Sequence, residues 1–379
     1  MVQVLSVEAC TAVVPLTVPT SFATRQVTAR QYSLIRVNCD DGSHGIGFCY
    51  GGSSFGELST AAALDLLAPV LFGQDPHRTE GLWDEMYQEA LLQGRAGSVM
   101  RALSCLDIAL WDRNARAANL PLWRMLGATS SGTVPAYASG GYYVDGKGKE
   151  ELDDEVRGYV AAGFGAVKIK VGKLSPAAEE GRVAAVRDAI GPDVLLMLDA
   201  NNAWQDLPTA MRTIERLAAF DPYWIEEPFG PDDVSNHARL AERVPFAVAT
   251  GEIEAGRWRH KALLDAKAAV ILQTDAAVCG GITEFRRIAG LAAAYGVKLA
   301  PHWFHDLHAP LVGSTSNAQF VEFFPGDDVL NFRRLVVRQL EVIDGELRLH
   351  EEPGLGFDFD EDFLATVSSG WRKVSRENS

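Results

Sequence analysis

The 379-residue sequence lacks several features that would place it in a special class of protein. Its five cysteines are widely spaced and form no C-x-x-C pair, which argues against a disulfide framework and against a zinc site. No stretch approaches the ~18 apolar residues that a membrane-spanning helix needs. Residues 1–8 have neither the basic start nor the apolar core of a signal peptide. We therefore expect a cytoplasmic protein with reduced thiols and no membrane partner.

The sequence is also poor in positive charge. Lys and Arg number 35 against 50 Asp and Glu, giving a formal net charge of −15. Binding to nucleic acid requires clustered Lys and Arg, so nucleic acid is an unsuitable partner. Clusters of acidic side chains instead suit a divalent cation.

The first part of the chain predicts strands followed by helices. Strand patterns occupy residues 2–18, 32–38 and 45–50, and helical spacing occupies residues 58–71, 79–92 and 98–118. The polar, threonine-rich residues 19–30 between the first two strands predict a mobile loop. This order is typical of an α+β module.

From residue 129 the pattern alternates between strand and helix. Eight strands are predicted, at residues 134–138, 166–171, 194–199, 223–226, 246–250, 270–274, 297–301 and 320–323. Several are apolar on both faces, as buried parallel strands are. Eight strands with intervening helices predict a (β/α)8 barrel over residues 129–325. A doubly wound open sheet is the alternative, but no strand is followed by a glycine-rich phosphate loop.

The tail predicts two short strands, at residues 340–344 and 346–350, with a turn at Asp344-Gly345. We expect them to rejoin the N-terminal module. That module would then be a discontinuous capping domain, residues 1–128 completed by residues 326–379.

Two lysines stand one residue apart in the apolar run at residues 167–172. Side chains alternate along a strand, so Lys168 and Lys170 share one face. Inside a barrel, mutual repulsion and burial would lower the pKa of at least one of them, and such a lysine can act as a base. The alternative is an edge strand with two solvated lysines.

Acidic residues end the next three predicted strands. Asp199, Glu226 and Glu252 follow one another at about the spacing of a βα unit, so they should meet at one barrel mouth. Buried together they require a cation, and an all-oxygen set suits Mg²⁺, with Mn²⁺ as the alternative. Singly, each could be a helix cap or a salt bridge. Glu227 should point away and be structural.

Asp275 and His302 end two further strands and could pair, the carboxylate orienting the imidazole. A structural histidine is the alternative, and His305 and His308 in the following loop compete for the same role. Glu322 ends the eighth strand.

An ordered set of motifs resembles the enolase superfamily, and within it the mandelate racemase subgroup. These are residues 104–112 (SCLDIALWD), 121–127 (PLWRMLG), the paired lysines, 198–201 (LDAN), 224–228 (WIEEP), 280–283 (GGIT), 301–302 (PH) and 353–356 (PGLG). The resemblance covers nearly the whole chain. It implies a modified TIM barrel, (β/α)7β, beneath an α+β capping domain, and it implies a homo-oligomer, either a dimer or an octamer.

The resemblance also implies a role for each candidate residue. Asp199, Glu226 and Glu252 match the metal ligands, Lys170 the base on one face, and His302 with Asp275 the acid-base pair on the other. Lys168 and Glu322 match groups that hold the substrate carboxylate. We further expect Tyr50, Tyr142 and Asn201 to contact substrate, and residues 19–30 and 50–57 to close over the site.

The expected reaction is Mg²⁺-dependent removal of the α-proton of a carboxylate substrate through an enediolate, a mechanism general to this superfamily. We favour a lyase that dehydrates an acid sugar, such as an aldonate, an aldarate or a tartrate-like acid, to a 2-keto acid. The polar segments at residues 50–54 and 138–143 suit hydroxyl-rich substrates. The alternatives are a racemase or epimerase of a hydroxy acid or amino-acid derivative and, more distantly, a non-catalytic protein that binds a metal or a sugar acid.

Overall fold

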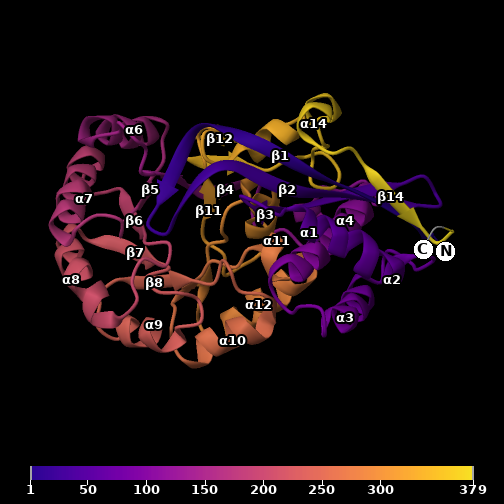
Figure 1. Cartoon of the computed structure of the whole chain (residues 1–379), viewed down its shortest axis with the longest axis horizontal. Helices are drawn as coiled ribbons and strands as arrows, with labels where there is room; N and C mark the ends of the chain where they lie inside the picture. The colour runs from indigo at the N-terminus through magenta and orange to yellow at the C-terminus, as the bar shows by residue number, and fades with distance from the viewer. Residues whose placement is uncertain (1, 378–379) are drawn as a thin grey trace.

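The computed structural model describes residues 2–377, so positions 1, 378 and 379 of the expected domains lie outside it. Figure 1 shows strands β5 to β8 wrapped by helices on one side, and helices α1 to α4 on the other. The two longest strands, β1 and β2, run across the molecule and connect the two sides. The ends of the described chain lie close together, where β14 pairs with β1.

The cap contains an antiparallel sheet of order β14-β1-β2-β3. Its strands are β1 (Val4–Phe22), β2 (Arg25–Cys39), β3 (His44–Gly52) and β14 (Arg372–Ser375). The expected mobile loop at residues 19–30 is wrong: Thr20 pairs with Val27, and the hairpin continues to its tip at residues 23–24. The threonines that suggested a loop are also good strand formers, which explains the error.

The cap helices pack on one face of this sheet. They are α1 (Glu57–Ala61), the π-helical turn η1 (Ala62–Leu67), α2 (Ala68–Leu71), α3 (Thr79–Ala90), α4 (Gly97–Ala117) and α5 (Leu122–Met125). Gly45 and Gly47 allow β3 to lie directly on α4, because a Cβ at either position would come within about 2 Å of a carbonyl oxygen of α4. The strand and the longest cap helix are thereby held in backbone contact.

Eight parallel strands belong to the second sheet. They are β4 (Thr133–Gly140), β5 (Ala166–Lys170), β6 (Leu195–Asp199), β7 (Pro222–Glu226), β8 (Ala247–Thr250), β9 (Ile271–Leu272), β10 (Lys298–Leu299) and β11 (Val321–Phe323). Neighbours pair in chain order from β4 to β10, and β11 returns to pair with β4. Between β10 and the β11 segment the structure has a single parallel bridge, Leu299 to Ala318.

Helices follow most of these strands and cover their outer face. They are α6 (Lys149–Ala161), α7 (Pro176–Ile190), α8 (Leu207–Leu217) with η2 (Ala218–Phe220), α9 (Val234–Ala241), α10 (Gly256–Asp265), α11 (Ala276–Cys279), α12 (Gly281–Ala294) and α13 (His305–Val312). Several starts are set by sequence: Ser175, Asp206 and Asp233 each cap a helix through the side chain.

The tail departs from expectation in one respect. It forms η3 (Asn331–Leu335), β12 (Glu341–Ile343), β13 (Glu346–Arg348), α14 (Glu361–Val367) and β14. The strands β12 and β13 do not rejoin the cap, because β13 pairs antiparallel with β4 and extends the second sheet. Only β14 enters the cap sheet. The free edge at the start of β4 explains why the hairpin adds there.

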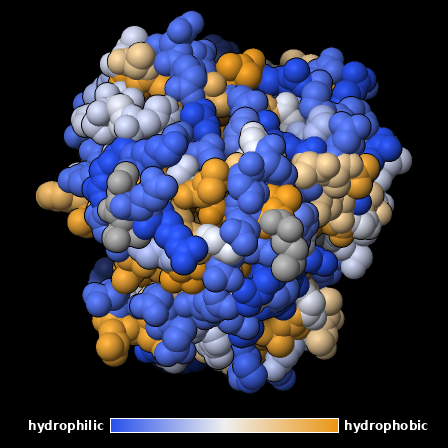
Figure 2. All heavy atoms as spheres, turned by 90° about the vertical axis from the view of Figure 1, so that its right-hand side faces the viewer, coloured by the Kyte–Doolittle hydropathy of each residue, from blue (hydrophilic) through white to orange (hydrophobic). Residues whose placement is uncertain are grey.

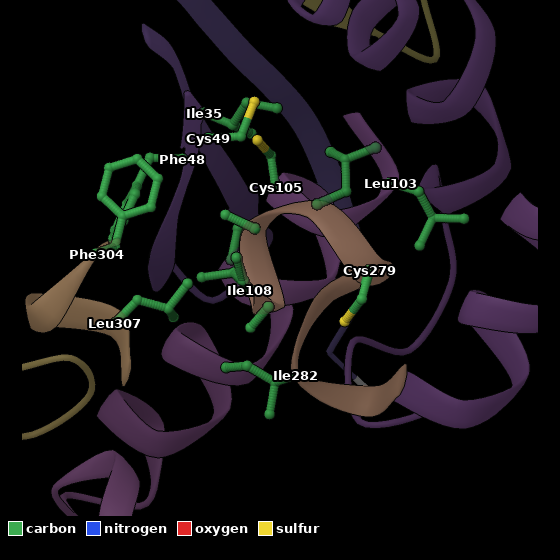
Figure 3. Close-up of a cluster of buried hydrophobic side chains, with 14 of the residues drawn as sticks. Ile35, Phe48, Cys49, Leu103, Cys105, Ile108, Cys279, Ile282, Phe304 and Leu307 are labelled. Carbon is green, nitrogen blue, oxygen red and sulfur yellow. The ribbon is translucent and has the colours of Figure 1, made fainter. Parts of the chain in front are cut away.

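A continuous apolar core joins the cap to the part of the chain that carries the second sheet. Figure 3 shows Phe48 and Cys49 of β3 and Cys105 and Ile108 of α4 near Phe304, at the start of α13. All five cysteines are buried as free thiols, as expected. Figure 2 shows a mainly hydrophilic outer face with separate apolar patches. Among the described residues no helix is both long and apolar enough to cross a membrane.

Candidate active site

The lysine strand β5 has the predicted alternation. Val167 and Ile169 join the apolar cluster beneath the outer helices, and Lys168 and Lys170 point to the other side. Lys168 is 0% exposed and Lys170 is 4% exposed. This burial rules out the alternative of a solvated edge strand.

Lys168 lies among acidic side chains from three other strands. Its Nζ is 2.7 Å from Glu226 Oε1, 2.7 Å from Glu322 Oε1 and 3.6 Å from Asp199 Oδ2. Lys170 pairs with Asp199, which faces it across the β5–β6 ladder. The two lysines therefore hold different carboxylates.

The lysine pKa values do not fall as expected. Burial opposes the charged form of both lysines, but nearby carboxylates outweigh it and raise the pKa of each. Glu226 acts mainly on Lys168, and Asp199 mainly on Lys170. The prediction of a depressed lysine pKa is wrong for this arrangement, because it counted the repulsion between the lysines and not the acids facing them.

The three predicted metal-binding acids come together. Asp199 faces Glu226 across β6 and β7, and Glu252 follows β8. Burial and the charge of Asp199 raise the pKa of Glu226, and burial with the charge of Glu227 raises the pKa of Glu252 to about 8. These shifts show that negative charge is in excess here, as three buried carboxylates require.

The donor set suits a hard divalent cation in atom type, charge and burial. Glu252 Oε2 is buried and has no hydrogen-bond partner in the chain. Within residues 2–377, however, no three His, Cys, Asp or Glu side chains already stand as a metal cage. Lys168 and Lys170 hold Glu226 and Asp199 instead. A bound cation would share or replace these lysine contacts.

Glu227 differs from expectation. It is 2% exposed and lines the cavity beside Lys170, although it was expected to point away as a structural residue. Its backbone has φ of 41°, in the left-handed region, so strand alternation no longer applies after Glu226. Burial and the charge of Asp199 raise the pKa of Glu227 to about 8.

His302 and Asp275 form the predicted pair. His302 Nδ1 is 3.1 Å from Asp275 Oδ2, and His302 Nε2 is 3.4 Å from Glu252 Oε1. Burial disfavours the imidazolium, but Glu252 and Asp275 outweigh it and raise the pKa of His302 to about 9. His308 lies behind Asp275, with its pKa lowered by burial to about 4, and accepts a hydrogen bond from Ala276 N at 3.0 Å.

Glu322 is held by groups from the lysine side and from the histidine side of the site. Ser139 Oγ and Trp303 N each donate to it at 2.7 Å, and Lys168 contacts Oε1. Burial raises its pKa, but Lys168 and His302 outweigh burial and lower the pKa to about 2. Glu322 is therefore a permanent anion at neutral pH. His305, by contrast, is buried against the ring of Phe323 and does not line the cavity.

A cavity of about 280 Å³ lies over this group. Lys170, Glu252, Asp275 and His302 line it, whereas Lys168, Asp199, Glu226 and Glu322 do not. We call these eight residues the barrel group. The three expected substrate contacts, Tyr50, Tyr142 and Asn201, all line the cavity.

The cap contributes three cavity arginines that were not among the expected site residues, although Arg25 and Arg30 belong to the segment 19–30 that was expected to close over the site. Arg25 and Arg30 come from the β1–β2 hairpin and Arg101 from α4. The hairpin tip is fixed by a bridge from Ser21 to Tyr143 and by Phe22, whose ring meets that of Tyr142 at 6.5 Å. We call Arg25, Arg30, Tyr50 and Arg101 the cap wall. No local sequence pattern marks these arginines, because the directions of Arg25 and Arg30 depend on the pairing of a hairpin expected to be a loop, and that of Arg101 depends on how α4 packs in the cap.

Comparison with known proteins places this geometry in a family. Residues 5–127 match the mandelate racemase/muconate lactonizing enzyme N-terminal domain, and residues 151–363 match the enolase C-terminal domain-like model. The chain is 35% identical to L-talarate/galactarate dehydratase of Salmonella typhimurium, over 92% of this chain and 87% of the relative. It is 34% identical to D-galactarolactone cycloisomerase of Agrobacterium fabrum, over 92% and 94%.

Solved structures agree. The crystal structure of the Salmonella typhimurium LT2 L-talarate/galactarate dehydratase with Mg and L-lyxarohydroxamate has a TM-score of 0.91 and 31% identity, covering 99% of this chain and 95% of that one.

Proposed function

Because the chain belongs to the mandelate racemase/muconate lactonizing enzyme family of the enolase superfamily, we propose that it is a Mg²⁺-dependent dehydratase of an acid sugar. It is thus an enzyme of the lyase or isomerase type, as its named relatives are. We further infer that its eight parallel strands act as one (β/α)7β barrel, which the return of β11 to β4 supports.

The observation that carries the proposal is that two proton-handling groups reach one cavity from different strands. Lys170 comes from β5, and His302 follows β10. Between them stand buried carboxylates that suit a cation. Binding alone would require neither a buried lysine pair nor an oriented imidazole.

Asp199, Glu226 and Glu252 would hold the metal ion. When bound, Mg²⁺ supplies a Lewis acid that stabilises negative charge on the substrate carboxylate as the α-proton leaves. Lys168 is held by Glu226 and Glu322 and stays charged, so it positions the carboxylate and does not take the proton.

Lys170 accepts the α-proton at Nζ. Its contact with Asp199 keeps it protonated in the ligand-free chain, and a cation on Asp199 would weaken that contact and lower the lysine pKa. His302, protonated because its pKa is about 9, donates its proton to the β-hydroxyl, which leaves as water. The resulting enol tautomerises to a 2-keto acid. Asp275 holds the imidazole through Nδ1, so Nε2 faces the cavity side.

A panel of acid sugars with Mg²⁺ tests this proposal, with the 2-keto acid product measured. We expect turnover of at least one member and none after the metal is chelated. Inversion of a stereocentre without loss of water would replace dehydration by epimerisation. Binding of acid sugars without any reaction would favour a non-catalytic role.

A further inference from the structure

The cap wall carries positive charge that the chain itself does not neutralise. Arg25, Arg30 and Arg101 line the cavity, and none forms an ion pair with a carboxylate among the described residues. The chain has an excess of acidic residues, and several other buried or half-buried arginines have acidic partners, for example Arg113 with Asp41 at 2.7 Å and Arg116 with Asp112 at 2.7 Å. Unpaired cations around a cavity therefore need an explanation.

Arg30 is the strongest case because it is 3% exposed. Its Nε donates to Val329 O at 2.6 Å and its Nη1 to the hydroxyl of Tyr50 at 3.1 Å, so both partners are neutral. Its Nη2 is buried and has no hydrogen-bond partner. Leaving a charged donor buried and unpaired is costly, so such a group is a candidate for a ligand contact.

The neighbours of Arg30 hold it in place. The guanidinium lies 4.3 Å from the ring centroid of Trp303 and 5.3 Å from that of Tyr50. Arg101 Nη1 donates to Tyr50 O at 2.8 Å. Arg25, at the start of β2, is exposed and lies over the ring of Phe22 at 5.8 Å. Arg30 is thus held on several sides, Arg101 is held by one hydrogen bond, and Arg25 is exposed at the tip of the hairpin.

We propose that the cap wall binds a second anionic group of the substrate, the distal carboxylate of a dicarboxylic sugar acid. Arg30 is the anchor, and Arg25 and Arg101 are additional donors. This inference rests on the proposed function, in which the other carboxylate is held by the barrel group.

The charges on the two sides of the cavity favour this assignment. The barrel side presents Glu227, Glu252 and Asp275 beside Lys170 and His302, whereas the cap wall presents only cations and a phenol. A monoacid would leave the Arg30 guanidinium facing a neutral hydroxyl. A second carboxylate supplies the missing counter-charge and matches the planar fork of arginine. A cavity of about 280 Å³ suits a small ligand of this kind.

Matched substrate pairs test the proposal. The wild-type chain with Mg²⁺ is assayed on glucarate against gluconate and on galactarate against galactonate, since each pair differs only in the distal group. We expect the diacid to have the higher kcat/KM by at least about tenfold, as a hydrogen bond to a charged group implies. Arg30→Met and Arg101→Met should remove most of this preference, with little effect on the monoacid. Arg36→Met, on the same strand but paired with Glu361, is the control and should keep the preference.

An unreactive pair separates this inference from the proposed function. Adipate and 6-hydroxyhexanoate cannot be dehydrated to a 2-keto acid, and calorimetric titration measures their binding in the presence of Mg²⁺. We expect adipate to bind more tightly in the wild type and the difference to vanish in Arg30→Met. If adipate discrimination depends on the arginines but no acid sugar turns over, the anion site stands and the proposed function fails.

Three results would overturn the inference. Equal use of diacid and monoacid by an active wild-type chain is one. A second is an equal change of kcat/KM on both substrates in the arginine variants, which would indicate general damage to the protein. Arg25→Met changes a residue at the exposed tip and therefore provides a variant with little risk of misfolding. The third is a preference for 6-phosphogluconate over glucarate, which would show that the cap wall binds a phosphate and not a carboxylate.

Discussion

The barrel group and the cap wall face the same cavity but differ in how their charges are satisfied. Every lysine, histidine and glutamate named in the barrel group has an oppositely charged neighbour from another strand or from the segment after it, as Lys168 has in Glu226 and Glu322 and His302 has in Glu252. The arginines of the cap wall have none. Side chains whose charges are already paired are held in position for proton transfer, whereas unpaired charged side chains are available to bind a ligand. From this difference we propose that the barrel group carries out proton transfer and that the cap wall selects the substrate.

Replacing the proposed base should give the largest effect on the barrel side. Lys170→Met removes the group that accepts the α-proton, so kcat should fall by about 10³-fold or more, near the upper part of the range for general acid-base catalysis. Lys298→Met alters an exposed lysine on β10, outside the cavity, and should leave kcat unchanged. Steady-state kinetics compares the two variants. A Lys170→Met enzyme with near wild-type kcat would remove the lysine from its role.

Replacing the proposed acid should be nearly as severe. His302→Asn should lower kcat by about 10² to 10³-fold, since the leaving hydroxyl loses its proton donor. In the wild type the pKa of His302 is raised to about 9, so the acid form persists through neutral pH. The rate should therefore fall as pH rises through about 9. A pH-rate profile in which this limb is absent would contradict the assignment.

A third prediction concerns the junction of the cap with the barrel. Asp107 on α4 is fully buried and accepts hydrogen bonds from Thr283 N at 2.9 Å and Thr283 Oγ1 at 2.6 Å. Burial raises its pKa to about 7. The folded chain then binds this proton more tightly than the unfolded chain, so Asp107 makes stability fall as pH rises from about 4 to about 7.

Asp107→Asn should remove this slope. Urea unfolding at pH 5 and pH 8 should show wild-type stability falling by a few kcal/mol more than that of the variant. Parallel pH dependences in the two proteins would show that Asp107 titrates normally.

The smallest effect is expected at the hairpin tip. Phe22 lines the cavity, and its ring meets Tyr142 edge-on. Phe22→Ala should loosen the tip and raise KM by roughly two- to tenfold, the value of an aromatic pair. The free energy of unfolding should change little, since Phe22 is only half-buried. A loss of kcat without a change in KM would instead give the tip a part in the chemical step.

The residues of the barrel group could be predicted because their positions follow from local rules of strand geometry. Alternation along β5 places Lys168 and Lys170, and parallel strand ends converge wherever the strands are correctly found. The rule failed one residue beyond a strand, at Glu227, where the backbone turns left-handed. It also gave the wrong direction for the lysine pKa, because the neighbouring acids belong to strands whose distance the sequence does not state.

Of the cap wall, only Tyr50 was predicted, and its three arginines could not be found in the same way. Arg25 is placed by the part of the hairpin that continues past Thr20, where it pairs with Phe22, whereas Arg30 pairs with Val14, before the register shift between Pro15 and Thr20. The tail strands were found, yet their partner was missed, because pairing to β4 depends on which sheet edge is free. Long-range pairing therefore set the limit of the prediction.

The division of labour between Lys170 and His302 is tested most directly by exchange of the substrate α-proton in deuterated water, followed by NMR with Mg²⁺ present. If Lys170 takes the proton and His302 acts afterwards on the hydroxyl, His302→Asn should still exchange the α-proton without forming the 2-keto acid, and Lys170→Met should do neither. Proton exchange that persists in Lys170→Met but disappears in His302→Asn would contradict the assignment. It would show that His302 takes the α-proton and Lys170 acts afterwards.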